Sequence, residues 1–116
     1  MKSTAEVLDR HLKCFGNRDI NGVMADYSAD AVFLGPEGAL RGPDAIKPVF
    51  ERFFAEFAKP GTSFAGKQRL IEGDYAYIVW SAETADNFYE LASDTFFIQN
   101  GSIRMQAFTA KVRPKR

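Results

Sequence analysis

Hydrophobic positions in the first part of the chain recur three or four residues apart. A capping-box sequence at residues 3–6 comes just before such a run, which continues to Phe15. This pattern predicts a helix from about residue 4 to residue 15. Asp19 is then placed to cap a shorter helix, which would carry Ile20, Val23, Met24 and Tyr27.

The next segment predicts short strands and a third helix. Residues 31–34 favour a strand that stops at Gly35-Pro36-Glu37-Gly38, and residues 40–41 predict a brief second strand. Residues 42–44 are typical of a helix start, and Pro48 inside this helix predicts a kink or a restart. The helix has one apolar stripe, formed by Ile46, Val49, Phe50, Phe53, Phe54 and Phe57.

From about residue 63 the hydrophobic period changes from 3.6 to 2. Four long strands are predicted, at 63–73, 75–85, 88–98 and 102–112, and the short turns between them require antiparallel neighbours. At 116 residues the chain is expected to form one domain, 1–116. The predicted fold class is α+β, with three N-terminal helices covering one side of a curved antiparallel sheet.

The hairpin turn expected at Asp86-Asn87 assigns side chains to the two sheet faces. A two-residue turn there pairs Val79 with Asp94 and Tyr77 with Phe96, on one face. Trp80 then lies on the other face. Since both faces are apolar and the helices cover only one, we expect a homodimer through the face bearing Trp80; loops covering that face are the alternative.

The last hairpin decides whether Gln106 lies beside Asp94. A three-residue loop at residues 99–101 pairs the two residues and is preferred here, because it also matches Phe97 with Ile103. The alternative is a two-residue Asn100-Gly101 turn, which places Asp94 beside Ala107 and turns Gln106 to the opposite face.

Composition excludes several classes of function. Fifteen basic residues balance fifteen acidic ones, which disfavours nucleic-acid binding. No apolar stretch approaches the roughly 20 residues of a membrane-spanning helix, so no membrane partner is expected. Cys14 is the single cysteine and no signal sequence precedes it, which favours the cytoplasm. One His and one Cys do not form a zinc cluster, so we expect no metal and no cofactor.

Asp94 is the leading candidate for chemistry. Placed in mid-strand among apolar residues, its carboxyl group should have a raised pKa and could act as a general base or donate a hydrogen bond to an oxyanion. His11 lies on the apolar face of the first helix and could form a proton-transfer pair with Asp94. The alternative is that His11 or Gln106 holds a buried Asp94 for structural reasons.

Further residues are expected to bind a ligand rather than to react with it. Gln106 and Tyr77 could orient the oxygen atoms of a small apolar molecule. The rest of the predicted binding site comprises Phe33, Gly35, Phe50, Phe54, Val79, Phe96 and Phe108. The 11 phenylalanines suit either a thick core or the wall of such a cavity.

Three segments, at 26–33, 40–46 and 94–103, together with the order of the elements, resemble the nuclear transport factor 2-like superfamily and its SnoaL-like branch. The resemblance implies a cone-shaped, cystatin-like α+β barrel with about four long strands and one or two short ones. The superfamily contains ketosteroid isomerases, polyketide cyclases, dehydratases and non-catalytic members, so the fold does not imply an activity.

The ketosteroid isomerase arrangement fits this sequence in part. Asp94 falls where that family has its oxyanion-hole aspartic acid, and His11 replaces the tyrosine of the first helix. Gly35, before Pro36, stands where the aspartate base would be. The resemblance therefore implies a small-molecule pocket but disfavours steroid isomerisation by that mechanism.

Three functions are compatible with the sequence. The first is a cofactor-independent isomerase, cyclase or dehydratase that uses Asp94 for proton transfer on a small apolar oxygenated substrate. The second is a non-catalytic protein that binds a hydrophobic ligand. The third is a dimeric interaction domain whose cavity has no ligand.

Overall fold

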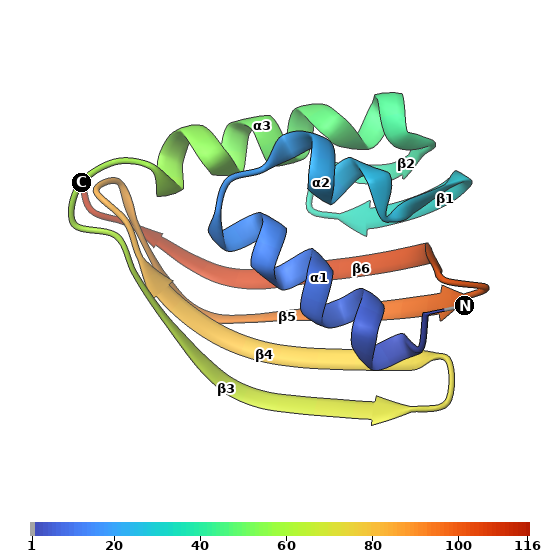
Figure 1. Ribbon diagram of the computed structural model, residues 1–116. Helices are drawn as coiled ribbons and strands as arrows, with labels where there is room; N and C mark the ends of the chain where they lie inside the picture. Colours follow the sequence, from blue (N-terminus) through green and yellow to red (C-terminus); the bar gives the residue numbers. More distant parts are fainter. Residues whose placement is uncertain (1) are drawn as a thin grey trace.

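The computed structural model describes residues 2–116, in which three helices precede or interrupt six strands (Figure 1). Helix α1 spans Thr4–Gly16 and begins with the predicted capping box, in which Ser3 and Glu6 exchange hydrogen bonds. Helix α2 spans Ile20–Ala25 and is capped by Asp19. Tyr27 was predicted to belong to α2 but begins the first strand, because the helix ends two residues earlier.

Helix α3 spans Pro43–Phe57 and buries five of the six residues in its predicted apolar stripe. It begins at Pro43, where a missing N–H costs nothing because the first helical amides have no partner within the helix. A kink or a restart was predicted at Pro48; the helix continues through this residue without a restart. One lost backbone hydrogen bond is offset here by the burial of Ile46 before Pro48 and of three phenylalanines after it.

The strands form one open, mixed sheet. Strand β1 spans Tyr27–Gly35 and β2 spans Gly38–Arg41; the four long strands are β3 (Ser63–Glu72), β4 (Tyr75–Glu83), β5 (Asn87–Gln99) and β6 (Ser102–Pro114). Their order is β2-β1-β6-β5-β4-β3. All neighbours are antiparallel except β1 and β6, which are parallel. The predicted α+β class is confirmed, with six strands and without closure into a barrel.

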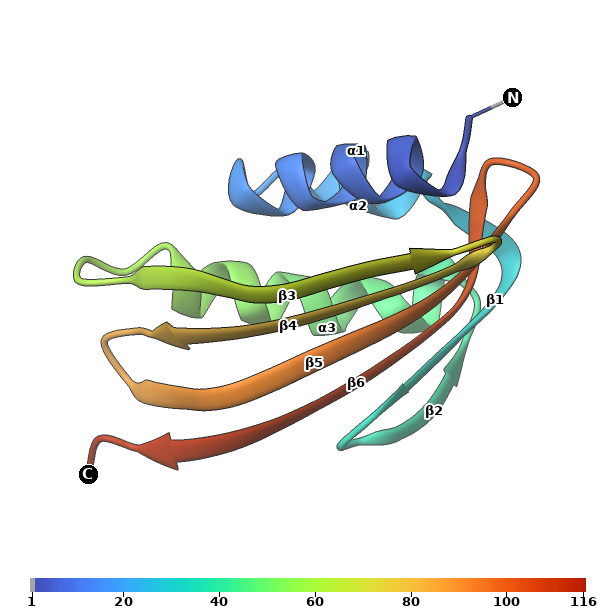
Figure 2. The ribbon, with the colours of Figure 1, turned by 90° about the horizontal axis from the view of Figure 1, so that it is seen from below.

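The long strands curve around the helices. Seen from below, β3 to β6 run side by side and bend toward the β1–β2 hairpin at one end (Figure 2). The helices cover the concave face, where the core lies. At its centre are the fully buried side chains of Leu8, Ile46, Phe96, Ile98 and Ile103.

The predicted register between β4 and β5 is wrong by one residue. Asp94 pairs with Ile78, not with Val79, because the turn lies at Ala85-Asp86 and a bulge follows it. The β4 side chains near Asp94 therefore lie on the opposite face of the sheet from the one predicted. Trp80 lies on the concave face and is only 6% exposed. A dimer interface was predicted on the face that bears Trp80, but the helices of the same chain cover that face.

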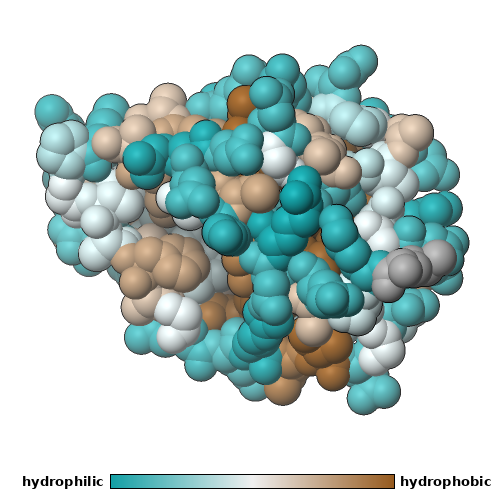
Figure 3. Space-filling view, viewed as in Figure 1, coloured by the Kyte–Doolittle hydropathy of each residue, from teal (hydrophilic) through white to brown (hydrophobic). Residues whose placement is uncertain are grey.

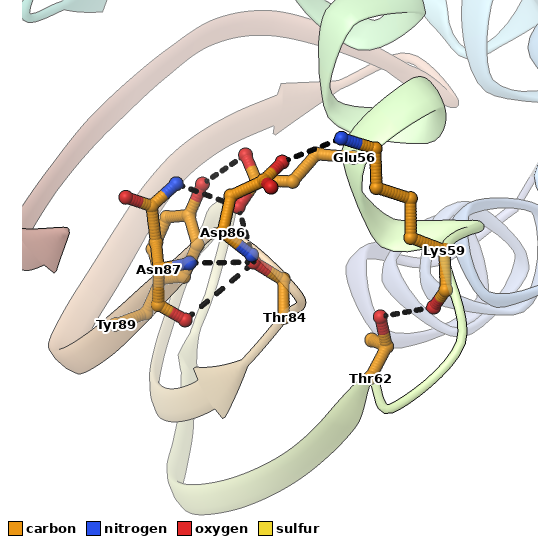
Figure 4. A network of polar contacts seen from close by, with 7 residues as sticks. All are labelled: Glu56, Lys59, Thr62, Thr84, Asp86, Asn87 and Tyr89. Atoms are coloured by element: carbon orange, nitrogen blue, oxygen red, sulfur yellow. Dashed lines mark hydrogen bonds and ion pairs between the residues drawn. The ribbon is translucent and has the colours of Figure 1, made fainter. Parts of the chain in front are cut away.

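A polar cluster joins the end of α3 to the β4–β5 turn (Figure 4). The Glu56 carboxylate accepts hydrogen bonds from the Thr84 hydroxyl at 2.6 Å, the Asn87 amide at 2.9 Å and the Tyr89 hydroxyl at 2.9 Å. Lys59, one turn later, forms an ion pair with Asp86 at 2.8 Å. These contacts hold the aromatic face of α3 over the sheet.

No helix within residues 2–116 is long and apolar enough to cross a membrane.

Candidate functional site

A small internal chamber lies between the helices and the concave face of the sheet. Its volume is about 50 Å³. Asp94, from the middle of β5, is one of the few polar groups in a wall that is otherwise mostly apolar. The wall is formed by His11, Leu12, Phe15, Phe33, Phe50, Phe53, Phe64, Ile78, Trp80, Asp94, Phe96, Gln106 and Phe108.

Gln106 reaches Asp94, although the predicted loop is wrong and so are the predicted pairs: Asp94 pairs with Phe108, and Phe97 with Met105. Asn100 and Gly101 both have positive φ, of 55° and 76°, and form a two-residue turn between the paired residues Gln99 and Ser102. This turn alone would direct Gln106 away from Asp94. A bulge between the Ile98–Ile103 and Phe97–Met105 pairs inserts one residue into β6 and restores the orientation.

Both oxygens of the Asp94 carboxyl group accept hydrogen bonds. Gln106 Nε2 donates to Oδ1 at 2.9 Å and Trp80 Nε1 donates to Oδ2 at 2.9 Å. Burial raises the pKa of Asp94, while these two hydrogen bonds and the nearby His11 oppose the rise. The result is a carboxyl group with a raised pKa, held in a fixed orientation beside an apolar chamber.

His11 is connected to Asp94 indirectly. Its Nε2 lies 3.5 Å from the Tyr27 hydroxyl, which donates to Gln106 Oε1, and Gln106 in turn donates to Asp94. Burial raises the pKa of Tyr27, so this hydroxyl stays protonated. The predicted pairing of His11 with Asp94 is thus replaced by a chain of three contacts through Tyr27 and Gln106.

Asp26 holds the other side of the imidazole. His11 Nδ1 lies 3.2 Å from Asp26 Oδ2, and Arg10 Nε donates to Oδ1 at 2.9 Å. Burial would raise the pKa of Asp26, but the hydrogen bonds from His11 and Arg10 outweigh burial and lower it. An ionised Asp26 orients His11 with its Nδ1 proton toward the carboxylate and Nε2 toward Tyr27.

Replacing Asp26 with asparagine is expected to lower the free energy of unfolding by about 2 kcal/mol at pH 7, because a buried charge-assisted hydrogen bond is weakened. The folded pKa of Asp26 lies below the ordinary 3.8, so this contribution is present above that pH and is lost as the pH falls through the folded pKa. Urea unfolding at pH 7 and at pH 3 measures the difference between wild type and variant. It should shrink at pH 3, and the exposed control Asp30→Asn should change stability less at pH 7.

Several of the predicted ligand-binding residues lie where expected. Phe33, Phe50, Phe96, Phe108 and Gln106 all line the chamber. The aromatic rings of the chamber wall meet mainly edge to face, as in the contacts of Phe50 with Phe33 and with His11.

The other predicted binding residues lie elsewhere. Tyr77 is exposed on the opposite side of β4, because it alternates with the inward residues Ala76 and Ile78. Val79 is on the same side as Tyr77 and does not line the chamber. Phe54 packs against Phe15 and Phe50 behind the chamber wall, and Gly35 lines a different pocket.

Two larger pockets adjoin the chamber from opposite sides. The first, here called the α3 pocket, lies between α3 and the β1–β2 hairpin and has a volume of about 260 Å³. The second, the β3 pocket, lies between the end of α1 and strands β3 and β4 and has a volume of about 420 Å³. The α3 pocket shares Phe33, Phe53 and Phe108 with the chamber, and the β3 pocket shares Leu12, Phe15, Phe64, Ile78 and Trp80.

Sequence reasoning missed three polar members of the site: Asp26, Tyr27 and Trp80. Asp26 follows a helix whose end could not be located to one residue, and Tyr27 was placed on that helix. Trp80 was assigned to the wrong face. Among residues 2–116, no group of three or more His, Cys, Asp or Glu side chains is arranged to hold a metal ion.

Comparison with known proteins places this arrangement in a family. The sequence model of the SnoaL-like domain family matches residues 8–105 of this chain. The chain belongs to the SnoaL-like domain family. A comparison with the curated proteins finds no match.

Solved structures share the fold of this SnoaL-like domain at low sequence identity. A putative polyketide cyclase from Sinorhizobium meliloti is 15% identical, with a TM-score of 0.73 over 89% of this chain and 93% of the other. A putative ketosteroid isomerase from Kribbella flavida is 12% identical, with a TM-score of 0.75 over 93% and 77%. An NTF2-like protein of unknown function from Cytophaga hutchinsonii is 12% identical, with a TM-score of 0.73 over 96% and 92%.

Proposed function

We propose that this SnoaL-like domain binds a small apolar molecule with a carbonyl or hydroxyl group and transfers a proton to or from it through Asp94, without a cofactor. The observation that carries the proposal is the position of Asp94, a carboxyl group with a raised pKa in the wall of an apolar chamber. Structural similarity to a putative polyketide cyclase and a putative ketosteroid isomerase supports a reaction of this type.

Asp94 can act in both of its protonation states, of which its two hydrogen bonds favour the carboxylate. As a carboxylate it is held by Trp80 and Gln106 and can remove a proton from a carbon next to a carbonyl group. As a carboxylic acid it can donate to the oxygen of the resulting enolate. Enolisation is a step common to isomerisation, cyclisation and many dehydrations.

The chamber admits only the reacting end of a substrate. Its volume of about 50 Å³ is close to the space of one or two water molecules, whereas typical ligand pockets measure roughly 300–1,000 Å³. The remainder of the molecule would therefore occupy an adjoining pocket. This small volume also favours a second candidate, a non-catalytic protein that binds a hydrophobic ligand mainly in the outer pockets.

Deuterium exchange distinguishes the two candidates without knowledge of the natural substrate. The protein is incubated in D₂O with an apolar ketone such as 2-tetralone, and the loss of the α-proton signal is followed by ¹H NMR. Exchange faster than in buffer alone supports proton transfer. Binding of the ketone, seen as a rise in melting temperature, without faster exchange would favour the non-catalytic candidate.

We further propose a homodimer through the convex face of the sheet, in place of the concave face that bears Trp80. Exposed apolar side chains gather on the convex face; they are Leu70, Tyr75, Tyr77 and Leu91. A second copy of the same face would cover them, since two-fold interfaces bury one patch against itself.

The Tyr77→Glu variant is expected to convert the dimer to a monomer, because it places two like charges in the buried interface. Analytical ultracentrifugation measures the mass of each species. The control Glu51→Gln, at an exposed position on α3 and away from the convex face, should remain dimeric. A wild-type protein that sediments as a monomer at 100 μM would rule out this interface.

A further inference from the structure

The β3 pocket combines apolar walls with a cationic rim. Its inner surface is formed by Leu12, Phe15, Phe57, Phe64, Ile78 and Trp80. The charged side chains around it are Arg18 and Arg69, and none of its lining residues is Asp or Glu. On the side of α1, hydrophobic side chains reach the surface between the helices and the neighbouring strands (Figure 3).

Arg18 is the available cation at this pocket. It lies in the corner between α1 and α2, with a left-handed φ of 54°, and its side chain is exposed. Arg69 is held by Asp9 at 2.7 Å, whereas Arg18 forms no salt bridge within residues 2–116. A guanidinium without a carboxylate partner can bind an anionic oxygen group at small desolvation cost.

The α3 pocket has the opposite character. Its charged lining residues are Glu37, Arg52 and Glu56, and Arg52 is already paired with Glu37. An anion approaching this pocket meets two carboxylates and one neutralised arginine. The two entrances to the chamber therefore differ in charge, and only the β3 pocket attracts an anion.

We infer that the β3 pocket binds an apolar molecule carrying one anionic oxygen group, with that group paired to Arg18 at the rim. The uncharged end points inward past Phe64 and Trp80, two residues that line both the pocket and the chamber. The opposite orientation would place the anion beside the buried Asp94 carboxyl group, where the low dielectric strengthens repulsion. The inference rests on the proposed function in treating this pocket as the outer part of the Asp94 site.

Two fluorescent probes with the same aromatic skeleton test the inference. One is 8-anilinonaphthalene-1-sulfonate, an anion, and the other is N-phenyl-1-naphthylamine, which lacks the sulfonate. The Arg18→Gln variant is expected to weaken binding of the anion about three- to fivefold, as for the loss of an exposed ion pair, and to leave the neutral probe unchanged. Arg18→Lys should retain most of the affinity for the anion, and the control Arg52→Gln, at the α3 pocket, should bind both probes normally.

Gly66 allows the pocket to be blocked without disturbing the fold. It pairs with Trp80 on the concave face and lines the pocket, and an added Cβ would meet no atom within 4 Å. Gly66→Leu is therefore expected to weaken both probes at least about tenfold while the melting temperature stays within a few degrees of that of the wild type.

Each outcome of these titrations decides a specific point. Arg18→Gln that weakens both probes equally, or neither, overturns the anion specificity. Gly66→Leu that leaves both affinities unchanged overturns the assignment of the site to the β3 pocket. Selective loss of the anion in Arg18→Gln together with loss of both probes in Gly66→Leu supports the inference. Whether Asp94 transfers protons is measured separately by deuterium exchange, so either claim can fail alone.

Discussion

The Glu56→Ala variant is expected to lose about 2–4 kcal/mol of unfolding free energy. Its carboxylate is the shared acceptor for the hydroxyl groups of Thr84 and Tyr89 and for the Asn87 amide. Thr84 is fully buried and Tyr89 is 6% exposed. In the variant their hydroxyl groups would lose this acceptor, and water has little access to replace it. The loss should also loosen the end of α3 from the β4–β5 turn.

Chemical denaturation in urea at pH 7 measures this effect. Glu51→Ala, at an exposed position one and a half turns earlier on α3, is the matched control and should change stability by less than about 0.5 kcal/mol. Equal stability of the Glu56→Ala and Glu51→Ala variants would show that the polar cluster does not hold α3 on the sheet.

The type and order of the helices and long strands could be predicted from the sequence. The Ser3–Glu6 capping box located the start of α1, and the change from helical to alternating period at residue 63 located the four long strands. These signals are local, since each depends on residues within one helical turn or one strand. The parallel pairing of β1 with β6 has no such local signal, because it joins residues more than 70 positions apart.

The details of the site depended on single-residue shifts that local patterns do not encode. The β4–β5 turn lies one residue earlier than predicted, and a bulge after it places Trp80 on the same face as Asp94 and Val79 on the other. The β5–β6 turn was also mispredicted, yet a bulge in β6 returned Gln106 to the Asp94 side. Bulges form where packing of both strands requires them, and the hydrophobic pattern of one strand does not reveal them.

The link between His11 and Asp94 illustrates a related limit. The sequence indicated that both residues face the interior, and both are buried. The connection itself runs through Tyr27 and Gln106, with Asp26 holding the far side of the imidazole. These five side chains come from α1, β1, β5, β6 and the C-cap of α2, so only the assembled fold shows that they form one network.

The Asp94→Asn variant is expected to slow deuterium exchange at the α-carbon of 2-tetralone by at least about a hundredfold, the usual range for loss of a general base. Asparagine has the same shape, and a flipped Gln106 amide can accept from it, so the fold should be retained. Because burial raises the pKa of Asp94 above 3.8, wild-type exchange should increase as the pH rises through that raised value. The variant should lack this increase.

The pH dependence of the stability of Asp94→Asn follows from the direction of the pKa shift of Asp94. A raised pKa in the folded state means that Asp94 favours folding when protonated and loses this contribution as the pH rises through its folded pKa. Removing the ionisable group should therefore make Asp94→Asn more stable, relative to wild type, at pH 8 than at pH 4. Thermal unfolding at the two pH values measures the difference.

The initial rate of α-deuterium incorporation into 2-tetralone, compared between wild type and Asp94→Asn at pH 7, tests the role of Asp94 most directly. Asp74→Asn, in the exposed β3–β4 turn, serves as the control, and N-phenyl-1-naphthylamine binding confirms that the pocket is intact. We expect exchange by wild type and by Asp74→Asn, and loss of at least about 99% of it in Asp94→Asn. Equal rates in wild type and Asp94→Asn, with the probe bound normally by both, would contradict proton transfer by Asp94.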